Sequence, residues 1–338
     1  MKDKRWSLAG HSLQILKVFL LLAIAGGLLF IAFRGVRIAT VVRDVGQANL
    51  FWVLGAALFS IAAFVSRAYR WSLLIEPLGY SPSLKNTTSS LMAGYLANLA
   101  LPRLGELTRC GSLSKAESIP FIPLVGTVIA ERVVDLISLF TCLLLLVIIE
   151  HNRFGTEFRS TILNPIIEPI ASHKWLALLL AIGVAGVFVV YRHFQSKHKG
   201  AGSFWSKLVI DLVTGLRSIT SLRRPWLFVF HSVLIWILYF LGMYCCFLAL
   251  PYTARLGYRA ALFALVVGGF GMSAPVQGGI GAYHLLVSRG LMLYGLSQQD
   301  GLAFATLVHS LQLLLVLVFG TASLIPLFLE RRMSRRKN

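Results

Sequence analysis

The chain has 338 residues, of which 57% are hydrophobic and only 13% are charged, and its formal net charge is +19. Its apolar residues come in runs of about twenty, the length that a helix needs to cross a bilayer, so the composition excludes a soluble globular protein and predicts an all-α polytopic membrane protein. The positive charge lies in the connecting segments, where it sets topology and attracts anionic phospholipids, and with no soluble module of sufficient length we expect no nucleic-acid partner.

Six segments are long enough for full crossings: 13–33, 50–74, 121–149, 175–192, 227–250 and 302–328. The first contains a signal-peptide-like Ala23-Ile24-Ala25, but its apolar run continues to Phe33, which favours an uncleaved anchor. Three further apolar segments, 84–101, 260–275 and 279–295, are short or broken by proline and glycine. Because irregular backbone is tolerated in a membrane only beside protein or a wet cavity, these segments predict two re-entrant or broken helical hairpins.

The charge of the loops predicts the orientation. The loop 192–226 and the tail 329–338 are strongly basic and are therefore placed in the cytoplasm, whereas 150–174 balances its charges and suits the outer side. If the N-terminus is cytoplasmic, the count of crossings requires segment 84–118 to enter and leave the membrane on the cytoplasmic side. Segment 260–295 must then enter and leave it on the outer side. We thus expect one polytopic domain, 1–338, with both termini in the cytoplasm.

Two weaker patterns lie within this framework. Residues 203–222 place an apolar stripe opposite charged residues, which predicts an in-plane amphipathic helix or, equally, a soluble cap on neighbouring loops. The hairpins share a Pro-x-x-Gly break, Pro102 to Gly105 and Pro275 to Gly278, with Gly94 or Gly268 upstream. Insertion of the two hairpins from opposite faces, together with the shared Pro-x-x-Gly break, predicts an inverted repeat with a site near the membrane midplane. The alternative is two ordinary proline kinks.

Charged residues occur deep in two predicted spans. Glu131, Arg132 and Asp135 lie within 121–149, where charge is costly, so they either serve function or lock two helices together. Arg67 and Arg70, three residues apart on one helical face, either extend to the interface or join Arg103 and Arg109 in gripping a phosphate, which suits the planar guanidinium.

The hairpin breaks supply the remaining candidate residues. In the first break, Gly105 permits close backbone approach beside Asn98, and Glu106 and Arg109 can pair with each other or with a ligand. The second break offers an approachable backbone with polar neighbours, at Gln277, Gly278, Gly279, Gly281 and His284. It lacks the GxxxxGK[ST] pattern of a nucleotide-binding loop. The cysteines show no metal-ligand spacing, and we expect no metal or cofactor.

Four motifs in order make a resemblance specific: Arg70-Trp71, Asn98-x-x-x-Pro102-x-x-Gly105-Glu106-x-x-Arg109, Glu131-Arg132-x-x-Asp135 and Pro275-x-x-Gly278-Gly279-x-Gly281. The chain resembles, over nearly its whole length, the transmembrane domain of the lysylphosphatidylglycerol synthase and flippase-like family. The resemblance implies a lipid-translocating domain in a prokaryotic inner membrane, with these residues lining a lipid cavity. Since the chain ends soon after its last span, we expect a stand-alone member without the soluble synthase domain. It departs from the family pattern at His284, where a Glu commonly stands.

The leading hypothesis is therefore translocation of a phosphate-bearing or aminoacylated lipid, with membrane lipid as the substrate partner. One alternative is a membrane-embedded transferase acting on a lipid-linked sugar or acyl donor, with Glu106, Glu131 or Asp135 as the base. Another is a secondary transporter of a soluble anion. The oligomeric state stays open, and a homo-oligomer is compatible with the sequence.

Overall fold

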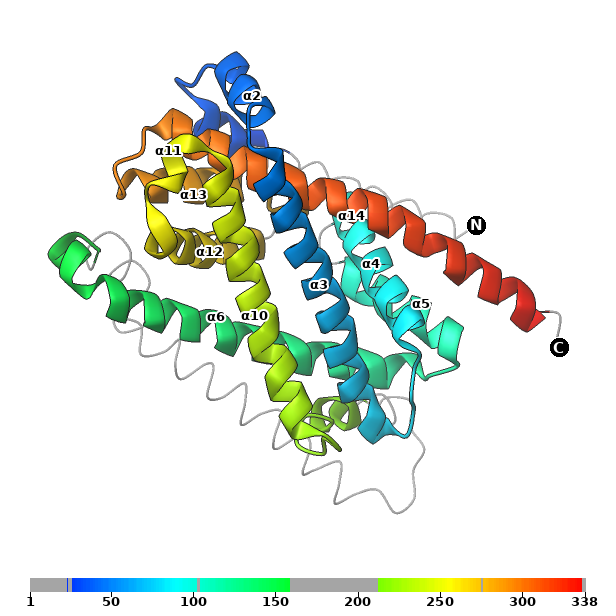
Figure 1. Ribbon diagram of the computed structural model, residues 1–338. Helices are drawn as coiled ribbons and strands as arrows, with labels where there is room; N and C mark the ends of the chain where they lie inside the picture. Colours follow the sequence, from blue (N-terminus) through cyan, green and yellow to red (C-terminus); the bar gives the residue numbers. More distant parts are fainter. Residues whose placement is uncertain (1–22, 24–25, 102–103, 159–211, 275, 336–338) are drawn as a thin grey trace, which may run out of the picture.

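The computed structural model describes residues 23, 26–101, 104–158, 212–274 and 276–335 (Figure 1). Within these ranges the regular structure is entirely helical, which confirms the predicted all-α class. The elements in chain order are α2 (Ile38–Gly46), α3 (Leu50–Ile75), the 3₁₀ turn η1 (Glu76–Leu78), α4 (Leu84–Ala100), α5 (Leu104–Glu117), α6 (Phe121–Phe158), α10 (Pro225–Ala249), α11 (Pro251–Ala254), α12 (Gly257–Ser273), η3 (Gln277–Gly279), α13 (Ala282–Met292) and α14 (Gln298–Arg335).

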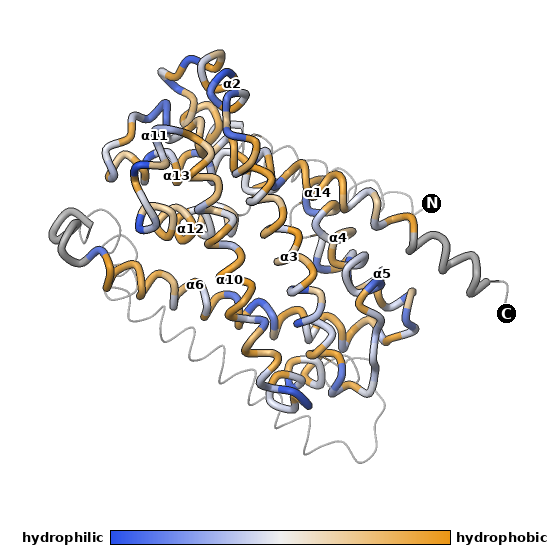
Figure 2. Tube along the Cα trace, in the orientation of Figure 1, coloured by the Kyte–Doolittle hydropathy of each residue, from blue (hydrophilic) through white to orange (hydrophobic). Residues whose placement is uncertain are grey.

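Among the described residues, four stretches of helix are long and apolar enough to cross a membrane: Leu50–Leu78, Phe121–Glu150, Pro225–Ala249 and Gln298–Ile325. They correspond to four of the six predicted crossings, and Figure 2 shows hydrophobic residues along them. The other two predicted crossings, 13–33 and 175–192, lie mostly or entirely outside the described residues. The outer face of α6 exposes large apolar side chains, including Leu136, Ile137 and Leu144, as a surface in contact with lipid tails does.

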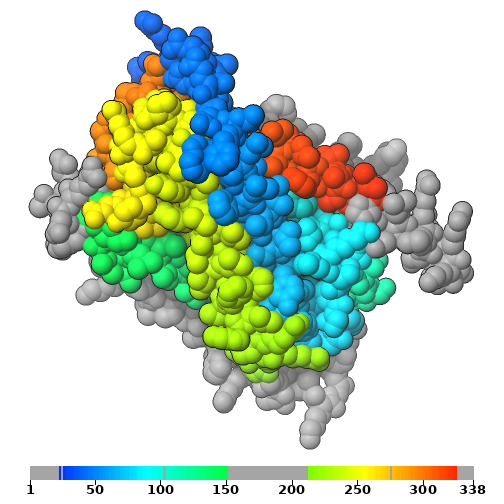
Figure 3. Space-filling view, viewed as in Figure 1, coloured from blue at the N-terminus to red at the C-terminus, as the bar shows by residue number. Residues whose placement is uncertain are grey.

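Helices α3 and α10 form an antiparallel pair that runs the length of the molecule (Figure 3). At one end the backbone N–H of Asn49 donates to the carbonyl oxygen of Ala249 at 2.9 Å. At the other end Leu73 and Leu74 pack against Phe228. The C-terminus of α3 therefore lies at the opposite end of the pair from the C-terminus of α10.

Both broken segments fold as helical hairpins, as predicted. The first consists of α4 and α5, and the second consists of α12 and α13. In each hairpin a glycine on the incoming helix faces the returning one. A Cβ atom added to Gly94 would lie 2.7 Å from the carbonyl oxygen of Gly105, and one added to Gly268 would lie 2.7 Å from the ring of Tyr283. The two upstream glycines thus have the same role in the two hairpins, which allows close packing of their arms.

The hairpins start from opposite ends of the α3–α10 pair and meet at their tips. The first follows the C-terminus of α3 and the second follows that of α10, so the antiparallel pair places their open ends far apart (Figure 1). At the tips, Gln277 Nε2 donates to the carbonyl oxygen of Ala100 at 3.0 Å. This is the arrangement that an inverted repeat produces.

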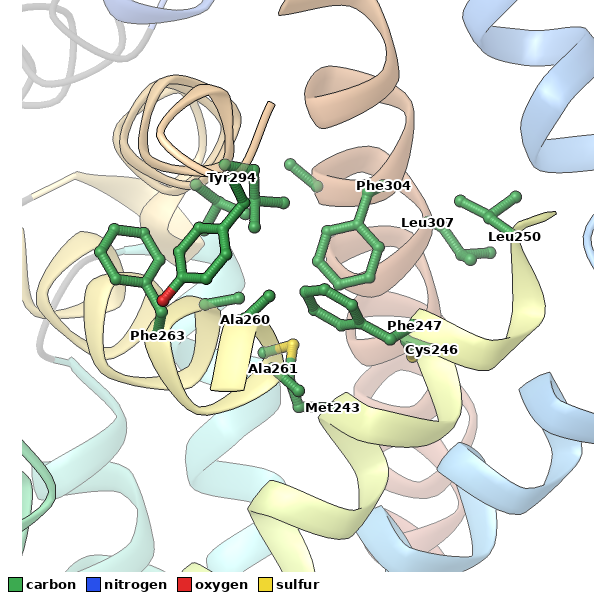
Figure 4. Packing of buried hydrophobic residues seen from close by; sticks show 14 of the residues in the cluster. Met243, Cys246, Phe247, Leu250, Ala260, Ala261, Phe263, Tyr294, Phe304 and Leu307 are labelled. Carbon is green, nitrogen blue, oxygen red and sulfur yellow. The ribbon is translucent and has the colours of Figure 1, made fainter. Parts of the chain in front are cut away.

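The second hairpin is held by a large apolar cluster contributed by α10, α12, α13 and α14 (Figure 4). At its centre the rings of Phe247 and Phe304 meet edge to face, with centroids 4.4 Å apart. A smaller cluster holds the first hairpin, where Cys110 and Leu113 of α5 pack against Trp71 and Leu124. Each hairpin therefore has an apolar support of its own.

The cytoplasmic loop predicted at 192–226 falls largely on residues 159–211, outside the described part of the chain. Residues 212–217 are helical and cross α6 closely, because a Cβ atom added to Gly215 would lie 2.7 Å from the Cα atom of Gly126. The in-plane helix, the basic tail and the domain limits stay predictions.

Candidate functional site

The arginines of α3 are buried rather than directed to the surface. Arg70 is fully buried and Arg67 is 8% exposed, so the alternative in which they extend to the membrane interface is wrong. Their spacing of three residues places both on the face of α3 that meets α6. Buried guanidinium groups require compensating charge, and α6 provides it.

Glu131 and Asp135, one helical turn apart on α6, pair with both arginines. Arg67 Nη2 donates to Glu131 Oε1 at 2.7 Å and to Asp135 Oδ2 at 2.8 Å. Arg70 Nη2 donates to Asp135 Oδ1 at 2.5 Å and lies 3.4 Å from Glu131 Oε1. Because each carboxylate contacts both guanidinium groups, the four side chains form one network and not two separate ion pairs.

The first hairpin adds a third buried arginine. Arg109 of α5 is 2% exposed, and its Nη2 lies 3.0 Å from Glu131 Oε2. Its guanidinium also stacks over the Trp71 ring, 4.7 Å from the centroid. The ring is fixed in turn, since Trp71 Nε1 donates to Thr127 Oγ1 at 2.9 Å. The network therefore joins α3, α5 and α6.

A fourth helix contributes two polar groups that the sequence analysis missed. Arg67 Nη1 donates to the hydroxyl oxygen of Tyr239 at 3.0 Å, and Arg70 Nη1 donates to Ser232 Oγ at 3.5 Å. Ser232 and Tyr239 lie seven residues apart on α10, which is two helical turns. A polar pair at that spacing in an apolar span is a signal that could have identified them.

A second ion pair borders the network and is half exposed. Arg132 Nη2 lies 3.0 Å from Glu106 Oε1, with side-chain exposures of 43% and 31%, and Arg132 Nη1 lies 3.9 Å from Asp135 Oδ2. The suggested pairing of Glu106 with Arg109 along α5 is therefore replaced by two contacts between helices. Arg109 points inward to Glu131, because an unscreened buried carboxylate binds a cation more strongly than an exposed one.

The network holds more positive charge and more donors than its protein partners use. Within the part of the chain that the structure describes, the four arginines at positions 67, 70, 109 and 132 face three carboxylates, which leaves one positive charge. Among the described residues, no hydrogen-bond acceptor contacts the buried Nε atoms of Arg67, Arg70 and Arg109 or the buried Nη1 of Arg109. An anion with several oxygen atoms would satisfy both the charge and the donors.

Asn98 and Gly105 shape the hairpin that carries Glu106 and Arg109. The backbone N–H of Gly105 donates to Asn98 Oδ1 at 2.7 Å, across the break. A Cβ atom added to Gly105 would lie 2.3 Å from the carbonyl oxygen of Gly94, so only glycine fits there. Arg103, predicted to join the arginines, lies outside the described residues.

The predicted residues of the second hairpin form a separate group. Gly278, Gly279 and Gly281 have φ angles of 55°, 75° and 82°, which glycine adopts readily, and they account for the sharp break. Gln277 binds the first hairpin at Ala100, as described above. His284 packs against His309 of α14, with ring centroids 4.9 Å apart.

Comparison with known proteins gave one family match and one curated relative. The family model described as the lysylphosphatidylglycerol synthase TM region matches residues 18–320 of the chain. A UPF0104 membrane protein of Methanocaldococcus jannaschii is 29% identical over 126 residues, which cover 36% of this chain and 38% of that protein. The chain therefore matches well under half of that relative's length. No solved structure matches the chain.

Proposed function

Because the chain belongs to the family of lysylphosphatidylglycerol synthase transmembrane regions, we propose that it translocates a phosphate-bearing lipid between membrane leaflets. The observation that supports this most directly is the surplus of buried guanidinium donors over carboxylate acceptors. Intramembrane charge is retained at a cost in stability, and its usual role is to bind or conduct a charged substrate.

Arg109 is the donor best suited to a phosphate. It contacts Glu131 through Nη2 alone, while Nε and Nη1 have no acceptor among the described residues. These two N–H groups lie on different edges of the planar guanidinium, and each can donate to an oxygen atom of a phosphate-bearing headgroup. In the absence of substrate, Glu131 and Asp135 stabilise the buried arginines. When a headgroup binds, its oxygens accept hydrogen bonds from the remaining guanidinium donors.

An aminoacylated headgroup fits the same site. Such a lipid carries an ammonium group in addition to its phosphate, and the ammonium requires an acceptor. Glu106 Oε2 is buried and lacks a hydrogen-bond partner among the described residues, while Oε1 of the same carboxylate binds Arg132. We propose that this free oxygen receives the ammonium.

The paired hairpins supply a route for alternating access. Their tips touch through Gln277 and Ala100, and their open ends lie at opposite ends of the α3–α10 pair. Separation of one hairpin from its neighbours would open the network to one side, and movement of the other would open it to the opposite side. The proposed location is the prokaryotic inner membrane, with both termini in the cytoplasm.

The transferase alternative has less support from this geometry. Glu106, Glu131 and Asp135 are the acids that could serve as its base, and each contacts an arginine. These contacts give the carboxylates a charge-balancing role, which differs from that of a general base. The soluble-anion alternative would use the same arginines, so only an experiment can distinguish it from lipid translocation.

The test uses the full chain in liposomes that contain fluorescent phosphatidylglycerol, lysyl-phosphatidylglycerol or phosphatidylcholine in both leaflets. A membrane-impermeant quencher reports exchange from the inner leaflet. We expect faster exchange of the first two lipids than of phosphatidylcholine, and loss of that exchange in Arg109→Gln. The matched control is Arg43→Gln, whose side chain is 67% exposed and remote from the network.

Equal exchange in wild type and empty liposomes would contradict lipid translocation. Uptake of inorganic phosphate into the same liposomes, abolished in Arg109→Gln, would support the soluble-anion alternative. Each variant is first checked for an unchanged size-exclusion profile, so that a misfolded protein is not scored as inactive.

A further inference from the structure

A second buried polar group lies between α13 and α14, apart from the arginine network. It consists of His284 and Tyr283 in the first turn of α13 and His309 in α14. These side chains are 6%, 3% and 3% exposed, respectively. The two imidazole centroids lie 4.9 Å apart, and that of Tyr283 lies 5.4 Å from that of His309.

Four polar atoms of this group lack a hydrogen-bond partner among the described residues. They are His284 Nδ1, His309 Nδ1, His309 Nε2 and the hydroxyl oxygen of Tyr283. A buried polar atom without a partner is destabilising, whereas apolar rings at such positions pack without that cost. Phe247 and Phe304 nearby are such a pair of apolar rings, and they meet edge to face. The two histidines therefore present buried nitrogen atoms that are free to bind a small ligand.

The chemistry of the group selects a proton as that ligand. A neutral imidazole has one donor nitrogen and one acceptor nitrogen, so the two neutral rings together offer two acceptor nitrogens to an added proton. The proton converts one acceptor into a donor, which can then share it with the acceptor of the other ring. Within the described ranges no third histidine, cysteine or carboxylate completes a metal-binding set with them.

The surroundings contain few other titratable groups. The Tyr283 ring faces His309, and Cys246 of α10 interacts electrostatically with Tyr283. From the N-terminal side Phe33 contributes its ring, 6.2 Å from that of His284. On α12, Gly268 and Gly271 face Tyr283 without side chains. These elements therefore place no carboxylate beside the histidines that could neutralise the charge of a bound proton.

We propose that His284 and His309 bind one proton between their rings and that this proton loosens the packing of the second hairpin. An uncompensated charge in an apolar site is unfavourable, so protonation favours any movement that admits water. His284 lies three residues after Gly281, whose φ of 82° marks the end of the break. Movement there would reach the tip contact at Gln277.

The test measures deuterium exchange at the imidazole C2 position by mass spectrometry, which follows the protonation of each histidine in the intact chain. Samples of wild type, His284→Gln and His309→Gln in detergent are compared between about pH 4 and pH 8. We expect the rings to titrate as a pair, so that replacing either one shifts the titration midpoint of the other. The control is His231→Gln on α10, whose Nδ1 already lies 2.9 Å from Ser66 Oγ and which should leave both midpoints unchanged.

The same samples give a second measurement through backbone amide exchange. Protonation should accelerate exchange in the first turn of α13 in wild type, and the double variant His284→Gln/His309→Gln should lose that pH dependence. If the titration midpoint of each histidine stays the same when the other is replaced, the two rings do not share a proton. If amide exchange is identical in wild type and the double variant, protonation does not loosen the second hairpin. Neither measurement depends on lipid exchange, so a failure here is distinct from a failure of the proposed function.

Discussion

Gln277, at the break of the second hairpin, donates a hydrogen bond to the carbonyl oxygen of Ala100, at the tip of the first, over 3.0 Å. The two residues lie 177 positions apart in the chain, yet each belongs to the corresponding part of its own hairpin. This contact joins the tips of the two hairpins, where the proposed lipid translocation would require a pathway to open.

Loss of that hydrogen bond should favour states with separated tips. Gln277→Met keeps the length of the side chain but leaves the Ala100 carbonyl unpaired, at a cost of about 1–3 kcal/mol. We expect amide exchange in residues 276–280 and 104–108 to become faster by about 5- to 150-fold. Hydrogen–deuterium exchange by mass spectrometry measures this.

The matched control for that prediction is Gln298→Met. Gln298 Nε2 makes an equivalent bond to the carbonyl oxygen of Ala32, at 3.1 Å, away from the tips. The Gln298→Met variant should leave amide exchange at both hairpin tips unchanged. Equal acceleration in the two variants would mean that general destabilisation, and not the tip contact, is responsible.

The buried network should show charge compensation. Glu131→Gln removes the carboxylate that contacts Arg67 and Arg109, and leaves the buried arginines with too little negative charge. We expect a loss of about 3–5 kcal/mol in the free energy of unfolding. Thermal unfolding in detergent, followed by circular dichroism, reports the change.

Removal of one positive charge should rescue that variant. In Glu131→Gln/Arg109→Gln one carboxylate and one guanidinium are lost together, so stability should recover in part. A double variant that is as unstable as the sum of its single variants would show that Arg109 and Glu131 act independently.

The upstream glycines should be equivalent in the two hairpins. Gly94→Ala would place a Cβ atom 2.7 Å from the carbonyl oxygen of Gly105, and Gly268→Ala would place one 2.7 Å from the Tyr283 ring. Each substitution must push the hairpin arms apart, at a cost of about 1–3 kcal/mol. The control is Gly46→Ala, where an added Cβ meets nothing within 4 Å. Thermal unfolding should separate the first two variants from the third.

Much of this architecture could be predicted from local patterns. The apolar runs identified α3, α6, α10 and α14, and the proline and glycine breaks identified both hairpins, because backbone geometry and lipid contact act on short stretches of chain. Burial of charge in α6 was equally visible, since an acid deep in an apolar run must find a partner.

The pairing of these residues could not be predicted in the same way. Spacing along α5 suggested that Glu106 would meet Arg109, whereas each meets a residue of α6. Likewise, Tyr239 contacts Arg67 only because α3 and α10 are antiparallel neighbours. Such contacts depend on the packing of helices that are far apart in the sequence, and a single sequence carries no measure of that packing.

The last prediction concerns orientation, which follows from combining loop charge with the fold. The basic segments predict that residue 80 lies in the cytoplasm, and the antiparallel α3–α10 pair puts residue 255 at the opposite end of that pair. Green fluorescent protein inserted after residue 80 should therefore fluoresce, because it matures in the cytoplasm. Alkaline phosphatase inserted after residue 255 should be active, because it requires the oxidising outer side. Exchanging the two reporters should silence both, whereas activity of the same reporter at both positions would contradict entry of the hairpins from opposite faces.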